Sequence, residues 1–169
     1  GSNSCYFDGR KAIQKSPSLG FLIGDEASGN YFGKQLLKLY FNNSLSNHLK
    51  TKFKSEYETS WPIISKNIYG SKRANSYLAK YFPFIVDNKN DSIIHNMIHK
   101  ALNEFFELHI LCYHNYQNTE INFVGSVAHY LSNEINTVSN KHNLTIGKII
   151  QHPIHKLINF HCNNKKNPI

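Results

Sequence analysis

Three short segments that contain glycine carry the residue types that could do chemistry in this chain of 169 residues. The first is Gly1-Ser2-Asn3-Ser4, which precedes an extended apolar run and an Asp-Gly turn. Small and hydroxyl-bearing residues in a tight turn can present backbone N–H groups and hydroxyls to a phosphate. The alternative is that Gly1-Ser2 is a remnant of cloning.

The second segment, Gly24-Asp25-Glu26-Ala27-Ser28-Gly29, lies between the strand-like apolar run Phe21-Leu22-Ile23 and a predicted helix. The carboxylates of Asp25 and Glu26 at such a junction can accept hydrogen bonds from sugar hydroxyls or help to hold a metal–water shell. The alternative is structural, because a capping residue and acids in a first helical turn complement the helix dipole.

The third segment, Val124-Gly125-Ser126, joins a predicted strand to a predicted helix. A glycine at this point lets a flat ligand approach the backbone, and the N-terminus of the helix favours anions or polar groups. The alternative is that the glycine only allows close packing of the strand against the helix.

Turn signals and apolar spacing predict the elements that position the first two segments. Asp8-Gly9 between two extended runs predicts a hairpin over residues 5–14. Helical spacing of apolar residues predicts helices over 31–41 and, most strongly, over 92–114. Two prolines divide the stretch 45–85 into a series of short helices, because the residue before proline avoids the helical region.

The last third of the chain alternates between strand and helix patterns. Strands are predicted over 121–127 and 145–150, and helices over 128–140 and 153–161. This order predicts a βαβ unit with a parallel pair of strands.

The order and spacing of the three segments resemble the C-terminal half of the BadF/BadG/BcrA/BcrD ATPase family, which includes N-acetylglucosamine kinases. This family belongs to the sugar kinase, Hsp70 and actin superfamily. Gly1-Ser2-Asn3-Ser4-Cys5 is similar to the end of its second phosphate loop, and Gly20 to Gly29 is similar to its Gly-Asp-Glu-Gly-Ser box. Phe123 to Ala128 resembles its adenosine segment, and Gln151 to His161 resembles its last strand-to-helix turn.

The resemblance implies that residues 1–169 form the C-terminal lobe of a two-lobed actin-like ATPase or sugar kinase. The expected fold is α/β: a ribonuclease-H-like lobe with a mixed sheet flanked by helices and a helical insertion over about 45–90. The N-terminal lobe would be absent from this chain. Nucleotide would bind in the cleft between the lobes, and hinge closure would complete the site.

The resemblance also implies which residues meet the nucleotide. Gly1, Ser2 and Asn3 would face the phosphates of ATP, and Gly125 and Ser126 would line the adenosine. The implied cofactors are ATP and Mg²⁺. The implied reaction transfers the γ-phosphoryl group to a hydroxyl of an amino sugar, mainly through positioning and charge stabilisation.

The implied sugar site rests on Asp25, which would contact the amino sugar, and on Glu26, which would support the loop. The chain departs from the family pattern at Ala27, where glycine is usual, and at His155-Lys156, where glycine is common. No Asp-x-Gly-Gly phosphate loop occurs, and the catalytic Asp of the family has no counterpart. We therefore assign no catalytic residue here and expect this polypeptide alone to be inactive.

Two other classes of function are compatible with parts of the sequence. An activator ATPase of the same superfamily is disfavoured, because the cysteines lack the spacing of an iron–sulfur site. A non-catalytic basic binding module rests only on the net charge of +8. The basic residues are scattered and only Arg10 and Arg73 are arginines, which argues against nucleic acid as a partner. A homodimer is a further partner that the resemblance implies.

Composition bounds the remaining possibilities. No apolar run reaches about 18 residues, so no membrane-spanning helix is predicted. The chain has three cysteines that are far apart in the sequence, Cys5, Cys112 and Cys162, and this predicts buried free thiols. Together with the lack of a secretory pattern at the start of the sequence, it predicts a cytoplasmic protein. His95 and His99 are spaced for a metal on a helix but lack further ligands, so no metal site is predicted.

Overall fold

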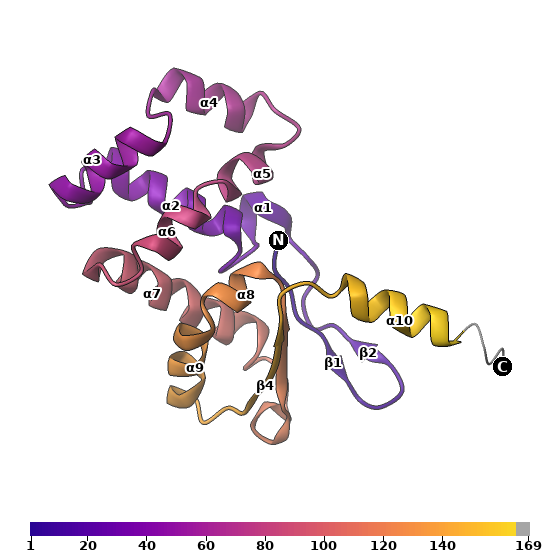
Figure 1. Ribbon diagram of the computed structural model, residues 1–169. Helices are drawn as coiled ribbons and strands as arrows, with labels where there is room; N and C mark the ends of the chain where they lie inside the picture. Colours follow the sequence, from indigo (N-terminus) through magenta and orange to yellow (C-terminus); the bar gives the residue numbers. More distant parts are fainter. Residues whose placement is uncertain (165–169) are drawn as a thin grey trace. The chain divides into compact units, whose positions relative to one another are not determined.

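The computed structural model describes residues 1–164 and divides into two compact units, Gly1–His114 and the residues from Asn115 onward. The first unit contains a strand pair and seven helices (Figure 1). These elements are β1 (Tyr6–Phe7), β2 (Ala12–Ile13), α1 (Gly20–Ile23), α2 (Gly29–Phe41), α3 (Asn47–Glu56), α4 (Trp61–Tyr69), α5 (Ala74–Ala79), α6 (Phe82–Asp87) and α7 (Ser92–His109).

The second unit contains a parallel strand pair and three α-helices among its described residues. A 3₁₀ turn, η1 (Tyr116–Asn118), precedes them. They are β3 (Ile121–Val124), α8 (Ser126–Tyr130), α9 (Ser132–Lys141), β4 (Ile146–Ile150) and α10 (Ile154–Asn164). No helix in the described part of the chain is long and apolar enough to cross a membrane.

The predicted hairpin is confirmed, with β1 and β2 paired antiparallel. The Asp8 carboxylate closes the turn, because its Oδ1 accepts hydrogen bonds at 2.8 Å from the backbone nitrogens of Arg10 and Lys11. These two N–H groups lower the pKa of Asp8 below its usual value, as expected for a carboxylate that is hydrogen-bonded in its charged form.

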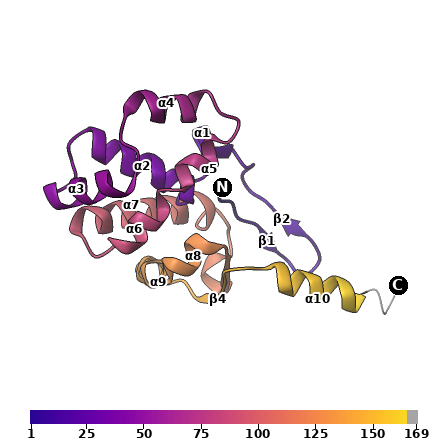
Figure 2. The ribbon, with the colours of Figure 1, turned by 45° about the horizontal axis from the view of Figure 1, so that its top comes forward.

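Helix α2 lies at the centre of the first unit and packs against α5, α6 and α7 (Figures 1 and 2). Its apolar face is the predicted one: Phe32 and Leu36 are fully buried, and Leu37 and Tyr40 are nearly so. The hydroxyl of Ser28 caps the helix by accepting from the backbone nitrogen of Tyr31 at 3.3 Å. This packing fixes the loop before α2, which is the Gly-Asp-Glu segment.

A cluster of aromatic rings joins the short helices α3 and α6 to α2. Phe53 lies at its centre, with ring centroids 5.0 Å from Tyr40, 5.6 Å from Tyr81 and 5.2 Å from both Tyr57 and Phe84. The predicted series of short helices over 45–85 is therefore confirmed, and its core is aromatic. Aromatic pairs at these separations add to the stabilisation that burial alone provides.

Three tyrosines of the first unit should resist ionisation. Burial is the main cause that raises the pKa of Tyr31, Tyr57 and Tyr81 above the usual value near 10. The folded state therefore keeps these protons where the unfolded chain releases them, so stability should fall as pH rises above about 10. An absorbance titration of tyrosinate should show these three of the ten tyrosines ionising only as the protein unfolds. Ionisation of all ten near pH 10, with unchanged circular dichroism, would contradict this.

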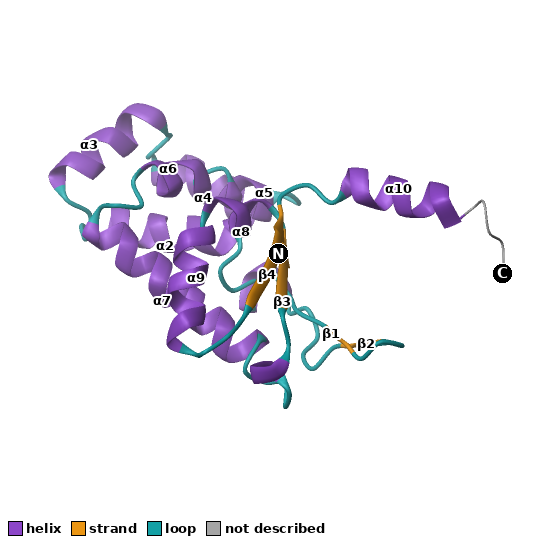
Figure 3. Cartoon of the chain, turned by 60° about the horizontal axis from the view of Figure 1, so that its bottom comes forward, coloured by secondary structure: helices purple, strands orange, loops and turns teal. Residues whose placement is uncertain are grey.

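The predicted βαβ unit is confirmed in the second unit, where β3 and β4 pair in parallel (Figure 3). The predicted helix over 128–140 instead begins at Ser126 and is broken at Leu131 into α8 and α9. Leu131 leaves helical geometry with φ −106° and ψ 25°, and its side chain is completely buried. The break directs this leucine into the core of the unit.

The expected single mixed sheet is not what residues 1–164 form. Their strands make two separate two-stranded sheets, one antiparallel (β1–β2) and one parallel (β3–β4). Among these residues each strand is paired along one edge only, because β1–β2 is a local hairpin and β3–β4 is a parallel pair connected through α8 and α9. The structure is thus an α/β chain of helices and two small sheets.

Two further expectations are corrected. The helix predicted over 92–114 ends at His109, where the Phe106 carbonyl accepts hydrogen bonds from both Ile110 and Leu111 at 2.9 Å. The three cysteines were predicted to be buried, but Cys5, Cys112 and Cys162 are all exposed free thiols. They lie on the hairpin, beyond the end of α7 and on α10, outside the apolar faces that form the core.

Candidate functional site

The Gly-Asp-Glu loop follows a short helix rather than the predicted strand. Residues Gly20–Ile23 form the single turn α1, closed by a 2.9 Å hydrogen bond from the Gly24 nitrogen to the Gly20 carbonyl. The Phe21 carbonyl accepts a hydrogen bond from Lys34 Nζ at 2.6 Å. These bonds satisfy backbone groups that a strand would have had to pair with a neighbouring strand.

The loop turns sharply because two of its residues adopt left-handed backbone conformations. Asp25 has φ +64° and Ala27 has φ +54°. Aspartate tolerates this region, whereas alanine pays about 1–2 kcal/mol to enter it. The backbone nitrogen of Ser28 donates to the Asp25 carbonyl at 3.0 Å and completes the turn. Alanine therefore adopts, at a cost, the loop shape for which glycine is suited.

Ala27→Gly should change the free energy of unfolding by less than about 1 kcal/mol. Glycine relieves the left-handed strain, which stabilises the folded protein by about 1–2 kcal/mol. Against this, the added conformational entropy of the unfolded chain destabilises it by about 0.4–1 kcal/mol, and the loss of the buried methyl group by about 0.8 kcal/mol. Ala101→Gly, at another buried position inside α7, should instead cost about 2 kcal/mol. Urea unfolding of both variants measures the difference, and equal losses would show that the Ala27 backbone is unstrained.

Asp25 is buried, and amide donors hold its carboxylate. Asn30 Nδ2, from the first turn of α2, donates to Oδ2 at 2.8 Å, and the Ser2 nitrogen donates to Oδ1 at 3.4 Å. The nitrogen of Gly1 lies 3.7 Å from Oδ2. A carboxylate has about four acceptor positions, so further positions remain for the hydroxyl of a ligand. The first two glycine-bearing segments of the sequence thus meet at one carboxylate.

Glu26 points into the protein and pairs with His109 near the end of α7. The distance between Glu26 Oε2 and His109 Nε2 is 2.9 Å, and the two side chains are 12% and 9% exposed. Because the carboxylate oxygen can only accept, Nε2 must carry the proton of this hydrogen bond. The pair ties the loop to α7.

Ser2 and Ser4 attach the N-terminal segment to the same region. Ser2 Oγ donates to the Glu26 carbonyl at 2.6 Å, and Ser4 Oγ donates to the His109 carbonyl at 2.6 Å. Asn3 differs from both, because it is exposed and its Oδ1 accepts from the Ser4 nitrogen at 2.8 Å. Of the three residues expected at the phosphates, Ser2 is therefore engaged with the loop, and Asn3 faces solvent.

Gly125 and Ser126 occupy the strand-to-helix junction of the second unit, as predicted. The Gly125 nitrogen continues the parallel ladder by donating to the Ile150 carbonyl at 2.8 Å. Its φ of +128° and ψ of 162° belong to a region that is essentially restricted to glycine. Apart from its two chain neighbours, no described residue has an atom within 4 Å of the position that a Cβ would take. The backbone here is thus open to a flat ligand, which fits the nucleotide that the resemblance implies.

Two residues of the first site were not recognised as such from the sequence. Asn30 stands next to the apolar spacing that predicts a helix over 31–41, and His109 falls within the apolar stripe that predicts a helix over 92–114. A histidine in such a stripe is a usable signal, because a buried polar group needs a partner. Asn30 Oδ1 and His109 Nδ1 are buried without a hydrogen-bond partner among the described residues.

The described residues hold no group of three or more His, Cys, Asp or Glu side chains that could bind a metal ion. His95 and His99 lie side by side on α7, with ring centroids 4.2 Å apart. The side chain of His155, at a departure from the family pattern, lies outside the described residues. A Mg²⁺ ion here would depend on one or two carboxylates together with nucleotide phosphates, as Mg²⁺ commonly does.

This fold is similar to that of a sugar-kinase-like protein of known structure. A crystal structure of the "Putative N-acetylglucosamine Kinase" from Porphyromonas gingivalis matches 98% of this chain with a TM-score of 0.90 and 30% sequence identity. The chain spans 58% of the length of that protein. No family model matches the chain, and no curated protein matches it.

Proposed function

We propose that this chain is the C-terminal lobe of a kinase that transfers the γ-phosphoryl group of ATP to an amino sugar of the N-acetylglucosamine type. We further propose that it belongs to the BadF/BadG/BcrA/BcrD ATPase family, with an actin-like, ribonuclease-H-like fold. The observation that carries the proposal is the likeness to the Porphyromonas gingivalis structure over 98% of the chain. The buried carboxylate of Asp25, held by amide donors, supports it independently.

Asp25 would accept a hydrogen bond from a hydroxyl of the sugar. The contacts of Asn30 and Ser2 hold the carboxylate in one orientation before the sugar arrives. Such preorganisation lowers the cost of positioning the acceptor. Glu26 would hold the loop in place through His109 rather than meet the sugar itself.

ATP with Mg²⁺ would supply the phosphoryl group. Gly1, Ser2 and Asn3 would face its phosphates, and Gly125 and Ser126 would line the adenosine. The left-handed Gly125 backbone with open space beside it supports the second assignment. The N-terminal segment supports the phosphate assignment less directly, because the Ser2 hydroxyl already donates a hydrogen bond to the Glu26 carbonyl.

The catalytic base would come from an N-terminal lobe that residues 1–169 do not include. The extent of the match, 58% of the neighbour's length, is consistent with such a lobe. The strands described here form only two-stranded sheets, whose further edges could pair with additional strands. The helices α3 to α6 would be an insertion into the lobe. The isolated chain would be inactive, and the complete protein could form a homodimer.

The test is ADP release by the protein carrying both lobes, with N-acetylglucosamine, glucosamine, N-acetylmannosamine and glucose offered separately. We expect turnover with one amino sugar and a loss of about 10- to 100-fold in kcat/KM for Asp25→Asn, because a hydrogen bond to a charged group is lost. Asp87→Asn, which alters an exposed carboxylate at the end of α6, should leave turnover unchanged.

The other outcomes separate the alternatives. ATP binding without sugar-dependent turnover would favour an activator ATPase of the same superfamily. Steeply salt-dependent binding of DNA without ATP binding would favour a non-catalytic basic module. Sugar-dependent turnover by residues 1–169 alone would contradict the assignment of the base to another lobe.

A further inference from the structure

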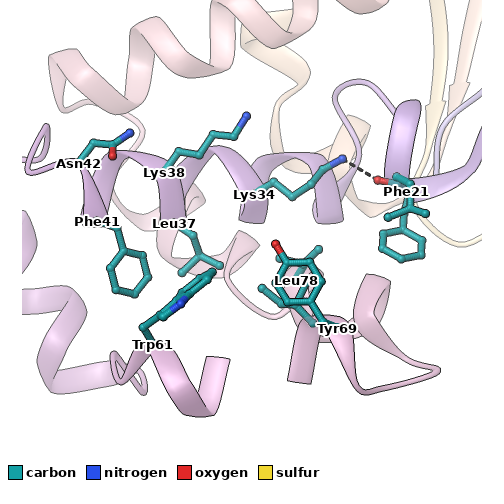
Figure 4. A pocket seen from close by; sticks show the side chains of 11 residues that line it. Phe21, Lys34, Leu37, Lys38, Phe41, Asn42, Trp61, Tyr69 and Leu78 are labelled. Atoms are coloured by element: carbon teal, nitrogen blue, oxygen red, sulfur yellow. Dashed lines mark hydrogen bonds between the residues drawn. The ribbon is translucent and has the colours of Figure 1, made fainter. Parts of the chain in front are cut away.

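The first unit contains a cavity of about 440 Å³ that the proposed sugar site does not use (Figure 4). Helix α2 forms one wall, and α1, α4 and α5 form the others. Its lining is mainly apolar and includes Phe21, Leu37, Phe41, Trp61 and Tyr69 beside the cation Lys34. Ligand cavities in proteins typically have volumes of about 300–1,000 Å³, so the space suits a small molecule.

One end of the cavity is aromatic. Phe41 and Trp61 meet edge to face, with ring centroids 5.4 Å apart, and Figure 4 shows Phe41 and Leu37 directed from α2 toward Trp61. Trp61 remains 48% exposed although it is a large apolar residue, and Tyr69, 79% exposed, lies between Trp61 and Phe21 in Figure 4. Exposed aromatic groups gathered around a concave surface typically mark a binding site.

The other end of the cavity holds a cation beside the aromatic ring of Phe21 (Figure 4). Lys34 is half-buried, and its ammonium group donates to the Phe21 carbonyl at 2.6 Å. Burial is the main cause that lowers the pKa of Lys34, although Asp25 and Glu26 favour its charged form. An anionic group bound beside Lys34 would compensate for this burial.

The two ends lie on one face of α2. Lys34 and Phe41 are seven residues apart, which corresponds to about 10 Å along a helix. Leu37 lies between them on the same face. Lys38 also borders the cavity, but Figure 4 shows its ammonium group on the opposite side of α2 from Trp61. A ligand that spans the cavity would thus need a charge at one end only.

We propose that this cavity binds a small apolar carboxylate about 10 Å long, with its carboxylate on Lys34 and its hydrocarbon end against Phe41 and Trp61. The match in charge favours an acid over a neutral lipid-like molecule. The aromatic end favours an alkyl or phenyl group, because such rings contribute large apolar contact areas. The inference is independent of the proposed kinase function, since it involves neither nucleotide nor sugar.

Trp61 is the only tryptophan of the chain, so its fluorescence reports on the cavity directly. Octanoate is the probe, and octanamide is a neutral control of the same length. In a titration of the protein, octanoate should change the fluorescence saturably and bind about tenfold more tightly than octanamide, because a charge-assisted hydrogen bond is the stronger one.

Two variants of matched charge locate the carboxylate. Lys34→Gln should remove the preference for octanoate, whereas Lys38→Gln, with the same change in net charge on the same helix, should keep it. The proposal is overturned if octanoate and octanamide bind equally, or if both variants behave alike. It is also overturned if octanoate binds by calorimetry without a change in Trp61 fluorescence, or if fluorescence changes only through self-association in sedimentation.

Discussion

His109→Ala should lower the free energy of unfolding by about 3–5 kcal/mol, a large fraction of the stability of an ordinary domain. The substitution removes the partner of the Glu26 carboxylate, which lies 2.9 Å from His109 Nε2 and is 12% exposed. A carboxylate left buried without its donor either remains charged at a high cost or takes up a proton. Both outcomes weaken the folded state relative to the unfolded one.

Packing adds to this electrostatic loss. The His109 ring lies 5.0 Å from the ring of Phe105, one turn earlier on α7, and its backbone carbonyl accepts from Ser4 Oγ. Truncation to alanine therefore leaves a space next to Phe105 as well as an unpaired Glu26. The loop and the N-terminal segment both depend on this end of α7, so both should loosen together.

Urea unfolding followed by circular dichroism measures the effect. His114→Ala is the matched control, because His114 is exposed near the end of the same unit and should cost less than about 0.5 kcal/mol. Glu26→Gln retains an acceptor for His109 and should cost clearly less than His109→Ala. A His109→Ala protein as stable as the His114→Ala protein would show that the Glu26–His109 contact contributes nothing.

Local signals predicted much of the fold. The Asp8-Gly9 turn and the parallel pair of β3 and β4 follow from turn chemistry and from strand–helix alternation, which act over a few residues. The run Phe21–Ile23 was misread because three apolar residues between glycines fit either a strand or a helical turn. The conformation of this run depends on Lys34, thirteen residues later, whose ammonium group donates a hydrogen bond to the Phe21 carbonyl.

The candidate site was only half visible in the sequence. Asp25 and Glu26 were identified by residue type and by their place between two predicted elements. Their partners were not, because His109 lies 83 positions from Glu26 and is brought to it by the packing of α7. The left-handed backbone of Ala27 was equally hidden, since alanine gives no signal for that conformation. Tertiary contacts thus determine the partners of the loop and its backbone conformation, which residue spacing in the sequence does not reveal.

Gly33→Ala should destabilise the protein by about 3 kcal/mol, although it improves the intrinsic helix propensity of α2 by about 1 kcal/mol. Gly33 lies inside α2, where α5 crosses closely. A Cβ at this position would lie 2.0 Å from the Leu78 carbonyl oxygen and 2.7 Å from its carbon. Because these are backbone atoms, no change of side-chain rotamer relieves the overlap, and α5 must move as a unit.

Gly29→Ala is the graded comparison on the same helix. Its Cβ would lie 3.3 Å from the Ala79 Cβ, so a shift of a few tenths of an ångström accommodates it, and the loss should stay below about 1 kcal/mol. Urea unfolding of both variants separates the effect of helix propensity from that of steric overlap with the Leu78 backbone. If helix propensity decided the outcome, Gly33→Ala would be more stable than the unsubstituted protein. We expect the reverse, because the close approach of α2 to α5 holds the Gly-Asp-Glu loop against the core, and only a residue without a side chain permits it.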